Sequence, residues 1–69
     1  MSKIRPCEVS EDDIVVFLGA EYTVRVVEPY KNRMTRMVLY HEFTENELEA
    51  IFIPDFRIEC VLYQGRRLI

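Results

Sequence analysis

The sequence has few of the residues on which small catalytic and metal sites depend. Among its 69 residues there are two glycines, two cysteines, one histidine and no tryptophan. With so little glycine, no glycine-rich loop can hold a phosphate group, and no nucleophile-elbow or zinc-helix motif occurs. Two distant cysteines and one histidine do not supply the four ligands of a structural zinc site. We therefore expect a protein that is not an enzyme and that carries no metal or other cofactor.

Long apolar runs are also missing. No run reaches the length of a membrane span, and the positively charged first residues are not followed by the apolar segment of a secretory signal. We expect a cytoplasmic protein without membrane association, in which Cys7 and Cys60 stay reduced. The net charge of −3 at pH 7 argues mildly against a dedicated nucleic-acid-binding protein.

The strongest positive signal is a predicted β-hairpin over residues 14–27. Two runs of β-branched and aromatic residues flank Gly19-Ala20, and glycine in the first position of a two-residue turn is typical of type II′. A short helix after Ser10 is the competing interpretation, because an acid follows three residues later and Gly19 could end a helix. The β-branched run favours the strand.

The second half of the chain predicts more strands and one helix. Apolar alternation indicates strands over residues 35–41 and 56–63, with Gln64-Gly65 turning the chain into a last strand over residues 66–69. Thr44-Glu45-Asn46-Glu47 has the form of a capping box and precedes apolar residues at helical spacing. We expect a short helix over residues 45–52.

This order of elements predicts a β-rich α+β fold in one small domain over residues 1–69. Residues 1–8 form either a loose N-terminal arm or an edge strand. Three strands, a short helix and one or two final strands are compatible with a small antiparallel sheet. They are equally compatible with an SH3-like or Sm-like barrel of four to five strands, an analogy of layout alone.

Alternation along the strands divides the apolar residues between two faces. The predicted core face carries Ile14, Val16, Leu18, Tyr22, Val24, Val26, Met37, Leu39, Ile58, Cys60 and Leu62. The opposite face carries Val15, Phe17, Val27, Val38, Tyr40, Val61 and Tyr63, although a half-solvated sheet should be polar there. One short helix cannot cover all of it. Strand twist and the N-terminal arm bury the remainder, or it forms an interface with another protein.

The leading functional hypothesis follows from this second face. Tyrosine and arginine are typical of interface cores, so we expect protein-binding residues at Phe17, Arg25, Arg36, Tyr40 and Tyr63. The hypothesis is a small interaction module or inhibitor that binds a partner protein and forms a homodimer or larger assembly. Its size and acidity are typical of accessory proteins of phages or mobile elements.

Two alternatives remain open. The basic stretch with an adjoining tyrosine, formed by Tyr30, Lys31, Arg33 and Arg36, could grip phosphates and stack a base of RNA or DNA. An oligomer could instead hold a small anionic ligand between subunits at Arg66 and Arg67.

Three other features have a simple structural interpretation. His41 is expected to be a surface residue at a strand end, and Cys60 a small buried hydrophobe. The acids clustered at residues 8–13 and 42–49 are expected to be solvated, with those near the predicted helix start favoured by its dipole.

Overall fold

A computed structural model of the protein describes residues 2–68. Over these residues the chain forms seven strands and two short 3₁₀ turns. In sequence order these are β1 (Ser2–Ile4), η1 (Pro6–Glu8), β2 (Ile14–Phe17), β3 (Ala20–Pro29), η2 (Lys31–Arg33), β4 (Thr35–His41), β5 (Asn46–Phe52), β6 (Ile58–Tyr63) and β7 (Arg66–Arg67). Within residues 2–68 no helix is long and apolar enough to cross a membrane.

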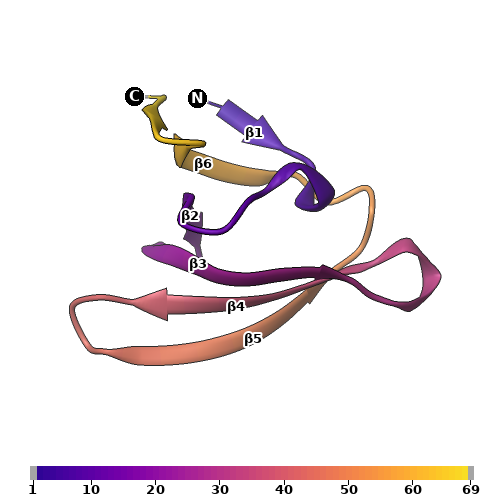
Figure 1. Cartoon of the computed structure of the whole chain (residues 1–69), viewed down its shortest axis with the longest axis horizontal. Helices are drawn as coiled ribbons and strands as arrows, with labels where there is room; N and C mark the ends of the chain where they lie inside the picture. Colours follow the sequence, from indigo (N-terminus) through magenta and orange to yellow (C-terminus); the bar gives the residue numbers. More distant parts are fainter. Residues whose placement is uncertain (1, 69) are drawn as a thin grey trace.

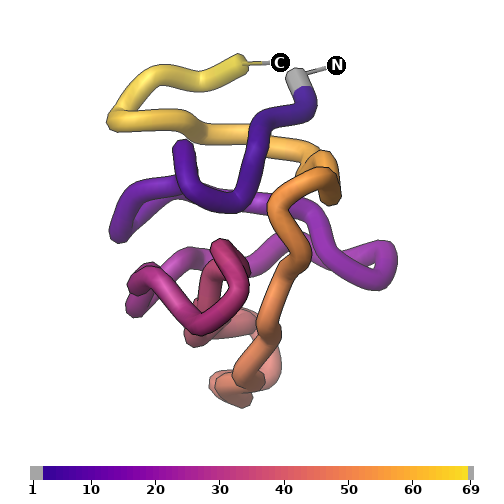
Figure 2. Tube along the Cα trace, turned by 90° about the vertical axis from the view of Figure 1, so that its right-hand side faces the viewer, coloured from indigo at the N-terminus to yellow at the C-terminus, as the bar shows by residue number. Residues whose placement is uncertain are grey.

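The strands form one open antiparallel sheet in the order β1-β6-β2-β3-β4-β5, with β7 also paired to β6. Figure 1 shows the sheet bent into two layers, with β1 and β6 above β3, β4 and β5. Figure 2 places the β4–β5 hairpin at the end of the molecule opposite β1 and the C-terminal segment. The predicted β-rich antiparallel fold is confirmed at this level.

The first hairpin turns one residue earlier than predicted. Phe17 pairs with Ala20, so the two-residue loop is Leu18-Gly19, and both residues have positive φ, 53° and 79°. This is a type I′ turn, not the predicted type II′. Residues that stand directly opposite each other on paired strands share a face, so Val15, which pairs with Tyr22, lies on the core side with Tyr22 and Val24. Val15 is fully buried, while Leu18 lies in the turn and is 83% exposed.

A bulge in β3 explains the wrong face predictions for Val26 and Val27. The register with β4 shifts between Val24 and Val26, which reverses the alternation beyond that point. Val24 is buried and Val27 packs against the core, whereas Val26 falls on the other face. The face predictions for Ile14, Val16, Leu18, Val15 and Phe17 were wrong because they put Val15 and Tyr22, which pair directly, on opposite faces. Those for Val26 and Val27 were wrong because of the bulge. Those for Val61 and Tyr63 were also wrong, since Val61 is 3% exposed and Tyr63 packs against the core.

The predicted helix over residues 45–52 is wrong, because this segment is strand β5. All seven of its residues pair with β4, from His41↔Asn46 to Thr35↔Phe52. Thr44 does not cap a helix, since its N–H and hydroxyl both contact His41 Nδ1 at 3.2 Å. Glu45 has a φ of 60° and belongs to the turn. A full ladder of pairing with β4 outweighs the local preference of an acid-rich segment for helix.

The core lies between the two layers and draws on almost every strand. Its most buried members are Val9, Val15, Val24, Met37, Leu39, Phe52, Ile58 and Cys60. The final turn, Gln64-Gly65, is confirmed: both residues have positive φ and β7 folds back on β6. Residue 69, the predicted end of that strand, lies outside the described residues.

Candidate functional site

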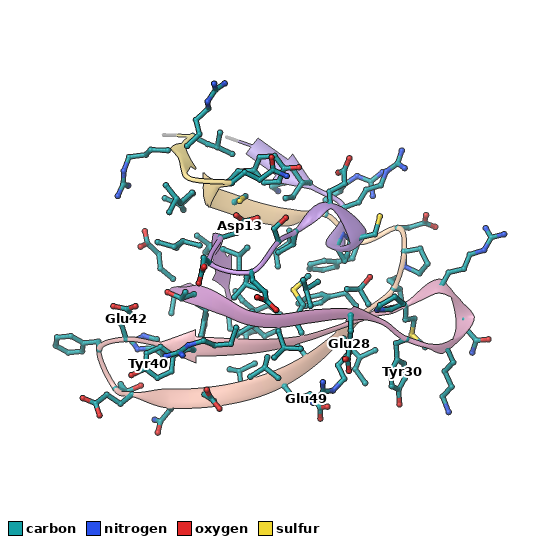
Figure 3. The ribbon with its side chains drawn as sticks, in the orientation of Figure 1. Asp13, Glu28, Tyr30, Tyr40, Glu42 and Glu49 are labelled. Atoms are coloured by element: carbon teal, nitrogen blue, oxygen red, sulfur yellow. The ribbon has the colours of Figure 1, made fainter. Side chains whose placement is uncertain are left out.

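Arg25 and Tyr40 form a contact on the outer face of the β3–β4–β5 layer, the face turned away from the core. The Arg25 guanidinium lies 4.1 Å from the centre of the Tyr40 ring, a cation–π distance. Figure 3 shows Tyr40 beneath β4 in the same orientation as Figure 1. Two of the predicted interface residues are thus brought together.

Arg36 lies on the same face and bridges three strands. Its guanidinium bonds to Glu28 of β3 at 2.8 Å and also to Glu49 of β5. The hydrogen bonds to Glu49 and then Glu28 raise the pKa of Arg36 above its usual value. With both carboxylates on its donor groups, Arg36 is less available to a phosphate than the sequence suggested.

Phe17 and Tyr63 do not belong to this outer face. Phe17 packs against the core, with its ring 5.4 Å from that of Phe52 and 6.4 Å from that of Tyr22. Tyr63 also packs against the core from β6. The structure therefore groups Arg25, Arg36 and Tyr40 and separates Phe17 and Tyr63 from them.

The β3–β4 tip carries three residues of the predicted nucleic-acid site. Tyr30, Lys31 and Arg33 are all exposed there, and Lys31 Nζ lies 5.9 Å from the centre of the Tyr30 ring. Arg36 is outside the tip, on the face of the sheet. The tip retains two cations and one aromatic ring.

The exposed apolar residues gather along β5 and the loop after it, where the sequence predicted a helix. Ile51 is 42% exposed, Ile53 57% and Phe56 41%. We call these three residues the apolar strip. A groove beside the strand is lined by the strip together with Phe17, Glu49, Ala50 and Phe52.

The floor of this groove is made of aromatic rings. The rings of Phe52 and Phe56 lie 5.3 Å apart, and Phe52 continues the cluster inward to Phe17. The aromatic side chains that line the groove are thus continuous with the hydrophobic core. Its open side exposes apolar surface that remains in contact with water.

β5 is an edge strand. Among the described residues it pairs with β4 alone, so every second N–H and C=O along its seven residues points away from the sheet. Such an edge is a template for another strand. The apolar strip and the free edge therefore lie on one element.

Sequence reasoning missed the apolar strip because the predicted helix placed Ile51 on a buried face. A usable signal was present in the loop. Ile53 and Phe56 flank Pro54-Asp55, and large apolar residues on both sides of a turn have little interior available to them in a chain this short. Phe43, which is 93% exposed in the β4–β5 turn, was also missed, because the sequence analysis did not consider apolar residues in turns.

Asp13 is a buried acid that the sequence placed among solvated ones. It is 1% exposed, and its two carboxylate oxygens accept hydrogen bonds from Ser10 N at 2.8 Å and Gln64 N at 2.7 Å. Figure 3 shows it beneath β6, between the two layers. These bonds fasten the loop before β2 to the β6–β7 turn, so the role of Asp13 is structural.

Cys60 is buried in the core and Cys7 is exposed, and both are free thiols. Burial, followed by the charge of Asp13, raises the pKa of Cys60 to about 11. Because thiolate is the reactive form, this shift makes Cys60 unreactive at neutral pH.

The other residues singled out in the sequence stand apart. The His41 ring meets that of Tyr22 edge-on at 5.3 Å. Arg66 and Arg67 are exposed on β7. Within residues 2–68 no three His, Cys, Asp or Glu side chains are grouped so that they could hold a metal ion.

No protein-family model, curated protein or solved structure matches this chain. Its function has therefore to be derived from its own residues.

Proposed function

We propose that this protein is a small, non-enzymatic interaction module that works by binding another polypeptide chain along β5. The observation that carries the proposal is the coincidence of a free strand edge with the apolar strip of Ile51, Ile53 and Phe56.

Edge and strip supply complementary parts of one binding mode. An extended segment laid beside β5 gains main-chain hydrogen bonds from the free edge, and its alternate side chains enter the groove beside the strand. Its apolar side chains would meet Phe52, Phe56 and Ile53, which already line that groove. This arrangement provides affinity through the backbone and specificity through side chains.

The outer face extends the same surface. Ile51 of the strip pairs directly with Arg36 across β4 and β5, and the Arg25–Tyr40 contact lies on that face too. Tyrosine and arginine are the residues most enriched where binding energy concentrates. Three of the residues expected from the sequence, Arg25, Arg36 and Tyr40, therefore support the proposal as its outer rim.

The experiment is affinity capture from a lysate of the source cells, followed by mass spectrometry. Ile53→Lys should lose the proteins that the native chain captures, because it places a charge in the groove. Leu18→Lys is the matched control. It also replaces an exposed branched aliphatic side chain by lysine, but in the β2–β3 turn, away from the groove. Circular dichroism should first show that both variants are folded. If the native chain, Ile53→Lys and Leu18→Lys then capture the same proteins, the proposed binding site along β5 is wrong.

The bend between the β1–β6 and β3–β4–β5 layers (Figure 1) supports a finer structural proposal, that of an SH3-like or Sm-like small barrel. Its test is a solution structure by NMR. A partly open barrel predicts side-chain contacts between the two layers across the core, with the outer edges of β1 and β5 left unpaired, and the absence of those contacts contradicts it.

A second candidate function rests on the β3–β4 tip, where Tyr30, Lys31 and Arg33 are exposed together. A cation beside an aromatic ring can bind single-stranded nucleic acid through phosphate contacts and stacking. The expected result is weak binding of a labelled oligonucleotide that falls steeply with salt and that Arg33→Glu weakens. Absence of binding at low salt eliminates this candidate.

A further inference from the structure

The two edges of the sheet carry opposite charge. On β5, Glu47 and Glu49 are exposed, and Glu45 in the preceding turn is exposed as well. At the other edge, Lys3 of β1 and Arg66 and Arg67 of β7 are exposed. The chain as a whole is acidic, so the cations at the β1–β7 edge do not come from a general excess of positive charge.

β1 and β7 together form one edge. β1 pairs with β6 at residues 58–60 and β7 at residues 62 and 63, both antiparallel. β2 occupies the opposite side of β6 at Cys60 and Leu62, so β1 and β7 follow one another along the same side. Their combined length along β6 is similar to that of β5.

The charged side chains of the two edges lie on corresponding faces. On β5, Leu48 and Ala50 pack against the core, which leaves Glu47 and Glu49 on the outer face. At the other edge Ile4 and Leu68 pack against the core, and by alternation Lys3 and Arg67 point outward. If the two edges pair so that the sheet continues from one molecule to the next with both core faces on the same side, the acids of one edge lie beside the bases of the other.

We propose that β5 of one molecule pairs with the β1–β7 edge of a second copy, so that sheets join head to tail. This inference rests on the proposed function, because it names the chain that β5 binds. The two edges lie at opposite ends of the molecule (Figures 1 and 2). The contact is heterologous, and repetition of it produces a ring or an open chain of subunits.

Charge selects this pairing over a twofold contact between two β5 strands. In an antiparallel β5–β5 pair centred on Glu47, the two Glu47 side chains would stand opposite each other, whereas Glu49 is bonded to Arg36 of its own chain. Like charges directly opposite across two strands are destabilising. The head-to-tail arrangement replaces this repulsion with the attraction between Glu47 and Lys3 or Arg67.

The test is sedimentation velocity of the full chain over a range of concentrations, in low and high salt. The native protein should form species larger than a monomer, and these should diminish as salt screens the charges. Glu47→Lys is expected to weaken association by at least about tenfold, because it places like charges across the contact. Arg66→Glu/Arg67→Glu, altered only at the other edge, should do the same.

An equimolar mixture of the two variants gives the decisive result. In head-to-tail pairing, the unaltered basic edge of Glu47→Lys fits the unaltered β5 of Arg66→Glu/Arg67→Glu, and the two altered edges also carry opposite charges. The mixture should therefore associate more strongly than either variant alone. Glu11→Lys, a charge reversal at an exposed residue in neither edge, is the control and should associate as the native chain does.

A native chain that is monomeric at all concentrations overturns the inference, as does a mixture that fails to associate. If Glu47→Lys changes self-association and Arg66→Glu/Arg67→Glu does not, the contact is between two β5 strands, and the head-to-tail inference is wrong. The proposed function is judged separately. Capture that depends on Ile53 by a chain that does not self-associate leaves the function standing and removes only this inference.

Discussion

Replacing Asp13 should destabilise the fold far more than replacing its neighbour in sequence. Its carboxylate is buried and holds two backbone N–H donors, those of Ser10 and Gln64. A hydrogen bond to a charged group contributes about 1.5–3 kcal/mol. Asp13→Ala removes two such bonds, so we expect a loss of about 3–6 kcal/mol in the free energy of unfolding. A core of this size supplies only about 3–5 kcal/mol, and the variant should be largely unfolded at room temperature.

Asp13→Asn tests the same reasoning in a variant that folds. The amide oxygen can accept one of the two hydrogen bonds, but its NH₂ group faces the other donor. We expect a loss of about 1–3 kcal/mol, measured by urea unfolding followed by circular dichroism. The exchange of the Gln64 or Ser10 amide with solvent, followed by NMR, should accelerate at the same time.

Asp12→Asn is the matched control for Asp13→Asn. It removes the same charge one residue away at an exposed position, and its φ of 74° is one that asparagine tolerates. Its stability should stay within about 0.5 kcal/mol of the native value. Equal stability of the two variants would refute the structural role of Asp13.

Three further predictions concern the first turn, the thiols and the outer rim. Leu18→Asn should stabilise the protein by about 1 kcal/mol, because Asn-Gly suits a type I′ turn and leucine at positive φ does not; an unchanged or lower melting temperature contradicts the assigned turn. Iodoacetamide at pH 8 should modify Cys7 in the native protein and Cys60 only after unfolding, since burial raises the pKa of Cys60 to about 11; equal rates would show that the core opens readily. Tyr40→Ala should reduce partner capture without unfolding the chain, because the Arg25 guanidinium loses the ring on which it lies; unchanged capture excludes Tyr40 from the interface.

The antiparallel β-rich class could be predicted because its signals are local. The apolar alternation of residues 35–41 and the Gln64-Gly65 turn act within a few residues, and both elements form as predicted. The helix over residues 45–52 failed since its capping pattern is also local, while the pairing that overrides it comes from β4. A sequence does not reveal which segment will lie beside another.

The predicted faces failed for a related reason. The prediction put Val15 and Tyr22 on opposite faces although they pair directly in the hairpin, and the bulge beside Val24 reversed the end of β3. The first error comes from assigning the faces of one strand without its partner, whereas a bulge has no distinctive sequence signature and exchanges the buried and exposed sides of a strand. Phe17 was consequently expected on the surface and packs against the core.

The candidate site could likewise be predicted only where it depends on local alternation along a strand. Arg25 and Tyr40 could be predicted to share a face, because each directly follows a core residue, Val24 or Leu39, and the bulge changes the alternation only from Val26 onward. The apolar strip could not be predicted, since Ile51 is exposed only if its segment is a strand, and β5 offers a free edge only in this strand order.

Amide hydrogen exchange along β5 shows whether its free edge binds another polypeptide chain. NMR would follow the exchange of each amide of Asn46–Phe52 as the protein concentration is raised, and again with any captured partner added. We expect the amides that point away from β4, at alternate residues, to become protected, while those paired with β4 change little. Exchange at these alternate amides that stays fast under every condition would contradict this expectation.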